Sequence, residues 1–187
     1  MTDGVANNNT KSSGVSKPCH DAFIISGGCG MRKRLIRAVE SLSAVADVEW
    51  LDLERIAQVE VSSEDGANPI ESALIPNADG EWCAAEAGEQ TIRLIFDTPQ
   101  SIHRIHVVID ERERSRTQEF VLRWSESISE PLREICRQQW NFSPPNSTRE
   151  VEDYSVNLGK VTVLQLWIKP DIGGGNACAR LRQLRVA

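Results

Sequence analysis

The chain has 187 residues, of which 40% are hydrophobic and 26% charged, and its formal net charge is −6. This length and composition predict one globular domain with some residues left over. The acidic balance argues against a broad phosphate-neutralising surface, and so against nucleic acid as a partner. No apolar run approaches the roughly 18 residues that a membrane span needs, so no span is expected.

The N-terminal segment is polar. Asn, Ser, Thr, Gly and Lys dominate residues 1–20, and we predict a disordered leader over residues 1–30. The apolar stretch Phe23–Ile25 is far shorter than the roughly 7–15 residues of a signal-peptide core, so a cytoplasmic protein is expected. The five cysteines are odd in number and form no CxxC pair, which predicts free thiols rather than disulfides or a structural zinc site.

A helical pattern comes next along the chain. Residues 31–46 carry apolar side chains at helical spacing, with no Pro or Gly between them. A second short turn is predicted over residues 50–57, with Asp52 as a candidate cap. Together they predict a short helical N-terminal extension, residues 31–57, that covers apolar surface and carries no chemistry.

From about residue 58 the apolar period changes from 3.6 to 2. The alternating segments are residues 58–63, 90–96, 102–110, 118–125, 132–142, 153–158, 161–169 and 179–187. Turn residues separate them, and no helical pattern lies between them. The sequence thus predicts an all-β domain over residues 58–187, an antiparallel sandwich or barrel of eight strands. In the last segment the apolar positions slip, which predicts a bulge near Gln183.

The connections between these segments are of two kinds. The short ones are residues 97–101, 126–131 and 159–160. The long or irregular ones are residues 64–90, 111–116, 143–150 and 170–178. Since successive connections in an antiparallel sandwich alternate between its two ends, the short turns are predicted to share one end and the long loops the other. Functional residues concentrate on loops held by a rigid scaffold, so the long-loop end is the candidate site.

Trp140 and Phe142, which run into Pro144, allow two interpretations: a ligand platform, or core residues at the end of a strand. If residues 132–142 form a strand, Cys136, Trp140 and Phe142 share one of its faces. Apolar groups on a single face favour the core, and the proline then ends the strand.

A series of short motifs runs through residues 55–187. It comprises Ser62-Ser63 at the end of the first strand, Asp79-Gly80 before Trp82, Ile92, Leu94 and Phe96 as I-x-L-x-F, and Ile102, Ile105 and Val107 as I-x-x-I-x-V. In this order and spacing the chain resembles the discoidin, or coagulation-factor type C, family. The resemblance implies the galactose-binding-like fold, an eight-stranded jelly-roll sandwich. It also implies a binding module, usually for carbohydrates and in some members for phospholipid heads or proteins.

Many members of this family hold a structural calcium ion near the Asp-Gly loop, together with a Glu of the last strand. Here the resemblance implies Asn77 and Asp79 as oxygen donors to such an ion. The last-strand position holds Gln183, which lacks the charge that a hard cation prefers. No other cofactor is expected.

The candidate ligand contacts lie on the long loops. Sugar-binding relatives often place an Arg in the loop of residues 110–119, where Arg112, Arg114 and Arg116 are candidates because planar Arg donors can bridge vicinal hydroxyls. The alternative is a solvated loop whose charges nearly cancel. Asn176, after three glycines, and Asn146, in the polar loop of residues 143–150, are further candidates. The late loop lacks the aromatic that often stacks on a sugar in relatives, and a plain flexible loop is the alternative there.

No G-x-S-x-G, HExxH or phosphate-loop motif is present, so the chain is predicted not to be an enzyme. The sequence leaves two functions open. The first is a carbohydrate-binding module that uses the long-loop end, as the resemblance implies. The second is an intracellular protein-interaction or scaffold domain, which the absence of an export signal and the free cysteines favour.

Overall fold

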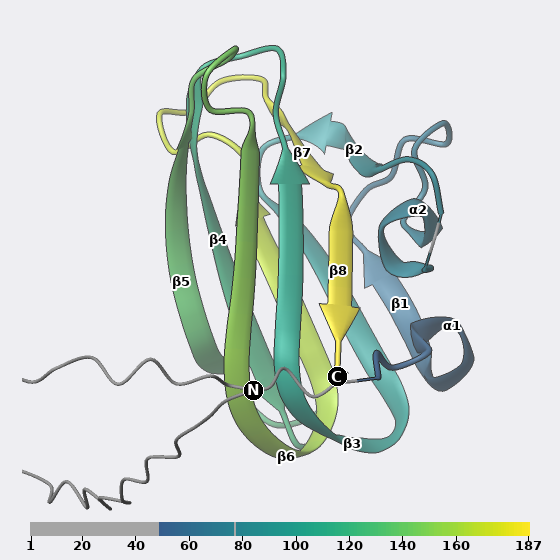
Figure 1. Cartoon of the computed structure of the whole chain (residues 1–187). Coiled ribbons are helices and arrows are strands. Elements are labelled where there is room, and N and C mark those ends of the chain that lie inside the picture. Colours follow the sequence, from purple (N-terminus) through teal and green to yellow (C-terminus); the bar gives the residue numbers. More distant parts are fainter. Residues whose placement is uncertain (1–48, 77) are drawn as a thin grey trace, which may run out of the picture. The chain divides into compact units, whose positions relative to one another are not determined.

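The computed structural model describes residues 49–76 and 78–187. In these residues alternating apolar side chains form antiparallel β-strands, accompanied by two one-turn helices (Figure 1). The predicted leader, residues 1–30, and the predicted helix, residues 31–46, lie outside the described residues, as does Asn77.

The helices are α1 (Leu53–Ile56) and α2 (Glu71–Leu74). The strands are β1 (Ala57–Val61), β2 (Trp82–Ala87), β3 (Gln90–Asp110), β4 (Arg116–Ser125), β5 (Arg133–Phe142), β6 (Arg149–Lys169), β7 (Cys178–Leu181) and β8 (Gln183–Val186). Among the described helices, none is long and apolar enough to cross a membrane.

β3 and β6 each run for 21 residues and pair antiparallel along their length. The register shifts between Ile95 and Gln100 in β3, and Lys160 of β6 adopts a φ of 58°. Both strands bend at these positions (Figure 1). The sequence predicted a turn between separate strands at each position. The prediction of separate strands was wrong, because β3 and β6 remain hydrogen-bonded to each other on both sides of the bend.

The bend makes two layers from one hydrogen-bonded sheet. One layer contains β1, the first half of β3, the second half of β6, β4 and β5, in that order. The other contains β8, the second half of β3 and the first half of β6. β2 and β7 form a small separate sheet at the upper end of Figure 1.

Two further elements differ from the prediction. β2 was missed because its first three residues are all buried and its last three exposed, so it does not alternate. The last predicted strand divides at Arg182 into β7 and β8, which pair with different strands, close to the bulge predicted at Gln183. Asp52 precedes α1 as predicted, but its side chain makes no capping hydrogen bond.

The core lies between the layers and includes Trp82, Phe120 and the inward residues of β3. Phe142 is 2% exposed and belongs to this core, whereas Trp140 is half-buried and packs against it. The core interpretation of these two aromatics is therefore confirmed, with Trp140 nearer the edge because β5 is an edge strand. Within the described chain, Cys83, Cys136 and Cys178 are free thiols.

Candidate functional site

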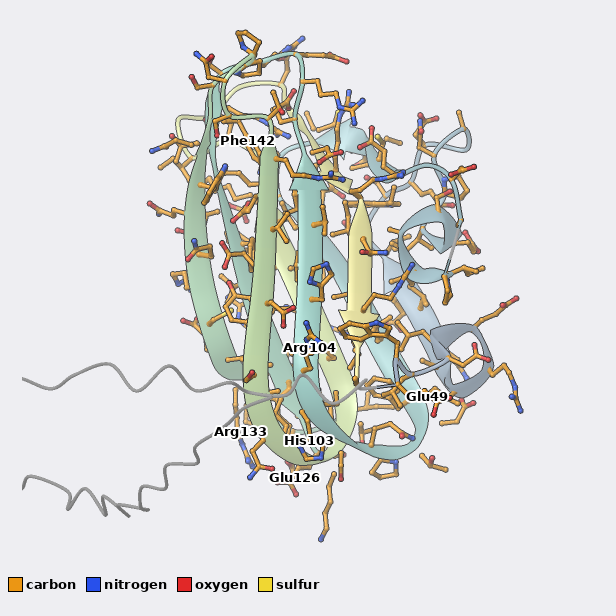
Figure 2. The ribbon with its side chains drawn as sticks, in the orientation of Figure 1. Glu49, His103, Arg104, Glu126, Arg133 and Phe142 are labelled. Carbon is orange, nitrogen blue, oxygen red and sulfur yellow. The ribbon has the colours of Figure 1, made fainter. Side chains whose placement is uncertain are left out.

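The long loops meet at one end of the sandwich, as the alternation of connections predicted (Figure 1). Backbone hydrogen bonds join the β3–β4 loop, residues 111–115, to the β5–β6 loop through Glu111 and Thr148, at 2.8 Å. The β6–β7 loop, residues 170–177, is joined to β4 through Ile172 and Thr117, also at 2.8 Å. Figure 2 shows Phe142 near this end, whereas Glu126 and Arg133 lie at the end that carries the short turns.

A buried ion pair holds the loops together. The Arg116 guanidinium lies 2.7 Å from the Glu111 carboxylate, and the two side chains are 2% and 6% exposed. Arg116 also donates hydrogen bonds to the carbonyl oxygens of Pro170 (2.9 Å) and Cys178 (3.3 Å), and its guanidinium lies 6.0 Å from the centre of the Phe142 ring. The Arg116 side chain therefore contacts the β3–β4 loop, the β6–β7 loop and the ends of β5 and β7. Its partners are internal, so we do not retain Arg116 among the candidate ligand contacts.

Glu111 shapes the β3–β4 loop itself. One of its carboxylate oxygens accepts the backbone N–H groups of Glu113 (2.8 Å) and Arg114 (3.2 Å). Burial alone would raise the pKa of the Glu111 carboxyl, but the Glu113 N–H and the charge of Arg116 outweigh it and hold the pKa below its usual range. The loop that presents Arg114 is thus built around an ionised, fully used carboxylate.

Two of the predicted ligand residues come together here. The Arg114 guanidinium donates a 3.0 Å hydrogen bond to the Asn176 side-chain oxygen, and both residues are exposed. Gly174 and Gly175, with φ of 85° and 114°, allow the tight turn that precedes Asn176. The pair joins two loops that are 62 residues apart in the sequence.

A polar groove runs beside this pair. It consists of a hollow of about 300 Å³ and a smaller one of about 140 Å³, which share Glu113 and Arg180. We call it the loop-end groove, defined by Asn68, Gly80, Glu81, Asp110, Glu111, Arg112, Glu113, Arg114, Asn176, Ala177, Cys178, Arg180 and Arg182. No aromatic residue lines it within the part of the chain that the structure describes.

Arg180 crosses the groove between two carboxylates, at 3.0 Å from Glu81 and 3.2 Å from Glu113. The groove therefore alternates guanidinium donors with carboxylate and amide acceptors. Such a surface can satisfy hydroxyl groups, which both donate and accept hydrogen bonds. The charged partners make these bonds stronger than neutral ones.

The other predicted residues have different positions. Arg112 is 77% exposed, pairs with Asp110 at 3.1 Å and lines the groove. Asn146 is exposed in the β5–β6 loop and is not among the lining residues of the groove. Sequence reasoning missed Arg180 and Arg182, because they alternate with Leu181 and looked like the solvent face of an ordinary strand.

No protein-family model and no curated protein sequence matches the chain. Several solved carbohydrate-binding modules do match its structure. A CBM32 module from Clostridium perfringens, CpGH89CBM32-5, solved in complex with GalNAc-β-1,3-galactose, superposes with a TM-score of 0.55 at 17% identity, covering 74% of this chain and 99% of that module. The chain has the galactose-binding-like β-sandwich fold.

Two other modules share this fold. A pectin-binding carbohydrate-binding module gives a TM-score of 0.52 at 18% identity, over 71% of this chain and 90% of that one. The CBM32 module of AlyQ, in complex with 4,5-unsaturated mannuronic acid, gives 0.50 at 19% identity, over 75% and 98%. The fold class predicted from the alternating strands is confirmed.

Of the two predicted calcium donors, Asp79 lines a separate cavity of about 300 Å³, and Asn77 lies outside the described residues. Asp79 and Gln183 both line it, as the resemblance implied, but Arg149, Arg182 and Arg185 line it too. Calcium needs six to eight oxygen ligands, several of them anionic. Three guanidinium groups against one carboxylate do not fit a divalent cation, and no cluster of three acidic, His or Cys side chains suited to a metal occurs among residues 49–76 and 78–187.

At this cavity, the Arg185 guanidinium already places a positive charge beside the C-terminal end of α2. It donates hydrogen bonds to the carbonyl oxygens of Ala73 (3.1 Å), Leu74 (2.6 Å) and Ile75 (2.9 Å), at the end of α2. Arg185 itself is 6% exposed. Backbone oxygens that a calcium ion could bind are thus occupied by a side chain of the same protein.

Removing calcium should therefore leave the protein unchanged. We expect the same Tm, in thermal unfolding followed by circular dichroism, with excess chelator and with millimolar calcium. A site whose Kd lies about 100-fold below the calcium concentration would instead add about 2.7 kcal/mol of stability. A rise in Tm with calcium that the chelator reverses would contradict this account.

Proposed function

We propose that this chain is a non-catalytic carbohydrate-binding module and that the loop-end groove holds the sugar. The observation that carries the proposal is the Arg114–Asn176 pair, an exposed donor and acceptor that two loops bring together at 3.0 Å beside the groove. The fold shared with carbohydrate-binding modules supports the choice of ligand class.

The geometry suits a sugar in three respects. The groove has room for about one or two sugar rings, with hollows of about 300 and 140 Å³. Its polar groups are fixed in place, because Arg180 is held between two carboxylates and the β3–β4 loop by Glu111. Fixed groups lose less conformational entropy when they bind a ligand. Arg112 and Arg114 remain exposed and can turn toward hydroxyl groups.

No aromatic residue of the described chain lines the loop-end groove, which determines how a sugar would bind there. Without a stacking platform, hydrogen bonds must carry the affinity, so binding should depend strongly on individual polar side chains. We expect recognition of the pattern of hydroxyl groups rather than of an apolar sugar face. No step of catalysis is proposed for these residues.

Replacing Arg114 with glutamine should weaken sugar binding between about tenfold and a hundredfold, the equivalent of one lost charge-assisted hydrogen bond. The full chain would first be screened on a glycan array, and the best ligand then titrated calorimetrically against wild-type and Arg114→Gln protein. The Tm should stay unchanged, because Arg114 is exposed and makes no buried contact.

Arg133→Gln is the matched control, since Arg133 is an exposed arginine at the opposite end of the sandwich (Figure 2). It removes the same charge and should leave the Kd unchanged. Equal losses in both variants would show a nonspecific effect of charge. Failure of the wild-type chain to bind any sugar on the array would reject the proposed function.

A further inference from the structure

The cavity around Asp79 is a candidate site with no assigned ligand. Its volume is about 300 Å³, and it is lined by Ser72, Ala78, Asp79, Val108, Arg149, Arg182, Gln183 and Arg185. We call it the arginine cavity. It lies on the outer side of β3 and β8, since Val108 and Gln183 are paired neighbours there and the alternate residues Val107 and Leu184 are buried in the core.

Positive charge dominates this cavity although the whole chain carries a net charge of −6. Its lining holds three arginines and one carboxylate. Arg149 is paired with Asp110, at 2.9 Å. In residues 49–76 and 78–187, neither Arg182 nor Arg185 has a carboxylate within 4.0 Å, so their two charges are not neutralised by an ion pair.

The two unpaired arginines differ in how much of their hydrogen-bonding capacity is used. Arg185 is buried and donates to carbonyl oxygens of α2 and of Leu184, so it contributes charge and little else. Arg182 is half-exposed, and one of its terminal nitrogens donates to the Gly80 carbonyl. A guanidinium carries five N–H groups, so Arg182 retains donors in the fork that matches a carboxylate.

Arg182 also connects the two candidate sites, because it lines both the arginine cavity and the loop-end groove. A ligand that extends from one hollow to the other would pass this side chain. Ser72 and Gln183 add uncharged hydrogen-bonding groups beside it.

We propose that the arginine cavity binds the carboxylate of an acidic saccharide, with Arg182 as the main contact and Arg149 and Arg185 supplying charge. The sugar part of this inference rests on the proposed function, and the anion part rests on the cavity alone. Anions are favoured because, within residues 49–76 and 78–187, two guanidinium charges have no carboxylate partner in a cavity that has room for a sugar acid. The ligand then extends from the arginine cavity into the loop-end groove.

Calorimetric titration of the full chain with three probes tests this inference. The probes are digalacturonate, the neutral digalactose of matched size, and inorganic sulfate. We expect digalacturonate to bind at least about tenfold more tightly than digalactose, with an affinity that falls as salt is raised. Arg182→Gln should remove that preference, Arg149→Gln should reduce it, and Arg133→Gln, which removes a distant charge, should leave it intact.

The outcomes separate the two proposals. Sugar binding with no preference for the acid overturns the arginine cavity as a binding site and leaves the loop-end groove. The same conclusion follows if the preference survives in both the Arg182→Gln and the Arg149→Gln protein and both keep the wild-type Tm. Sulfate binding that depends on Arg182, with no binding of any sugar, supports the anion site and overturns the proposed function. An Arg182→Gln protein that fails to fold leaves the decision to Arg149→Gln, which should fold because the Arg149 side chain is 55% exposed. If none of the three probes binds, the arginine cavity is overturned, and the glycan array decides the proposed function.

Discussion

Replacing Arg116 with leucine is expected to lower the free energy of unfolding by about 3–5 kcal/mol, the usual cost of removing one member of a buried ion pair. The variant leaves the Glu111 carboxylate buried and without its guanidinium partner. It also frees the carbonyl oxygens of Pro170 and Cys178. Urea denaturation followed by tryptophan fluorescence measures the change.

Arg137→Leu provides the matched control for Arg116. Arg137 pairs with Glu119 at 2.6 Å and Glu134 at 3.0 Å, but it is 45% exposed, so its removal should cost at most about 1 kcal/mol. A double-mutant cycle with Glu111→Leu should return a favourable coupling energy for Arg116 and Glu111. An Arg116→Leu protein as stable as the control would contradict the role assigned to the pair.

The contribution of this pair should depend on pH in a defined direction. The pKa of Glu111 is lower in the folded than in the unfolded state. Its stabilising contribution is therefore present above the unfolded pKa of 4.5 and is lost as pH falls through the lower folded pKa. The difference between wild-type and Arg116→Leu protein should accordingly shrink in acid.

Glu150→Gln should act in the opposite sense and stabilise the protein at alkaline pH. Glu150 is 1% exposed, faces the core side of β6, and has a pKa raised from 4.5 to about 8, first by burial and then by the charge of Glu152. The side-chain amide of Gln118 donates a hydrogen bond to the Glu150 carboxylate, but at 3.5 Å this bond is long. One side-chain oxygen of Glu150 and one of Gln118 are buried without a hydrogen-bond partner among the described residues, which adds to the cost of an ionised Glu150.

Because the folded state keeps the proton on Glu150, the contribution of Glu150 to stability should be fully present below its unfolded pKa and should be lost as pH rises from there to about 8. Each pKa unit corresponds to about 1.4 kcal/mol, so the loss is on the order of a few kcal/mol. Glutamine supplies the hydrogen-bond donor at every pH. The variant should match wild type at pH 4 and exceed it at pH 9.

Urea denaturation across this pH range measures the effect of Glu150→Gln, and Glu54→Gln is its control because Glu54 is exposed on α1. The control should follow the wild-type profile. Parallel profiles for wild-type and Glu150→Gln protein would show that Glu150 does not keep its proton in the folded state.

Alternation along the chain predicted most of the sandwich. Ile105, Val107 and Ile109 are fully buried as their spacing indicated, and Phe142 closes the core at the end of β5. Periodicity reports which face of a strand is buried, but not whether a bend interrupts it. Pro99 and Gly159 therefore looked like turns, although β3 and β6 continue through them by pairing with each other.

The candidate site was predictable only in part. The order of long and short connections placed Arg114 and Asn176 at the same end, and they contact each other there. Nothing in the local sequence separates Arg114, which is exposed, from Arg116, which is buried beside Glu111, because that difference is set by contacts with Pro170 and Cys178. Likewise, the charge of the arginine cavity depends on folding β8 against α2.

The central claim is that this chain binds a carbohydrate at its long-loop end. The most direct measurement is a titration of the isotope-labelled full chain with digalactose and digalacturonate, following backbone amide shifts by NMR. The account predicts shifts concentrated at residues 111–115 and 170–177 and at Arg180, with added shifts at Arg182 and Gln183 for the acid. Shifts confined to the opposite end, at the bend of β3 (residues 97–101) and the β4–β5 loop (residues 126–131), would contradict it. So would binding of both sugars with no change at the long loops.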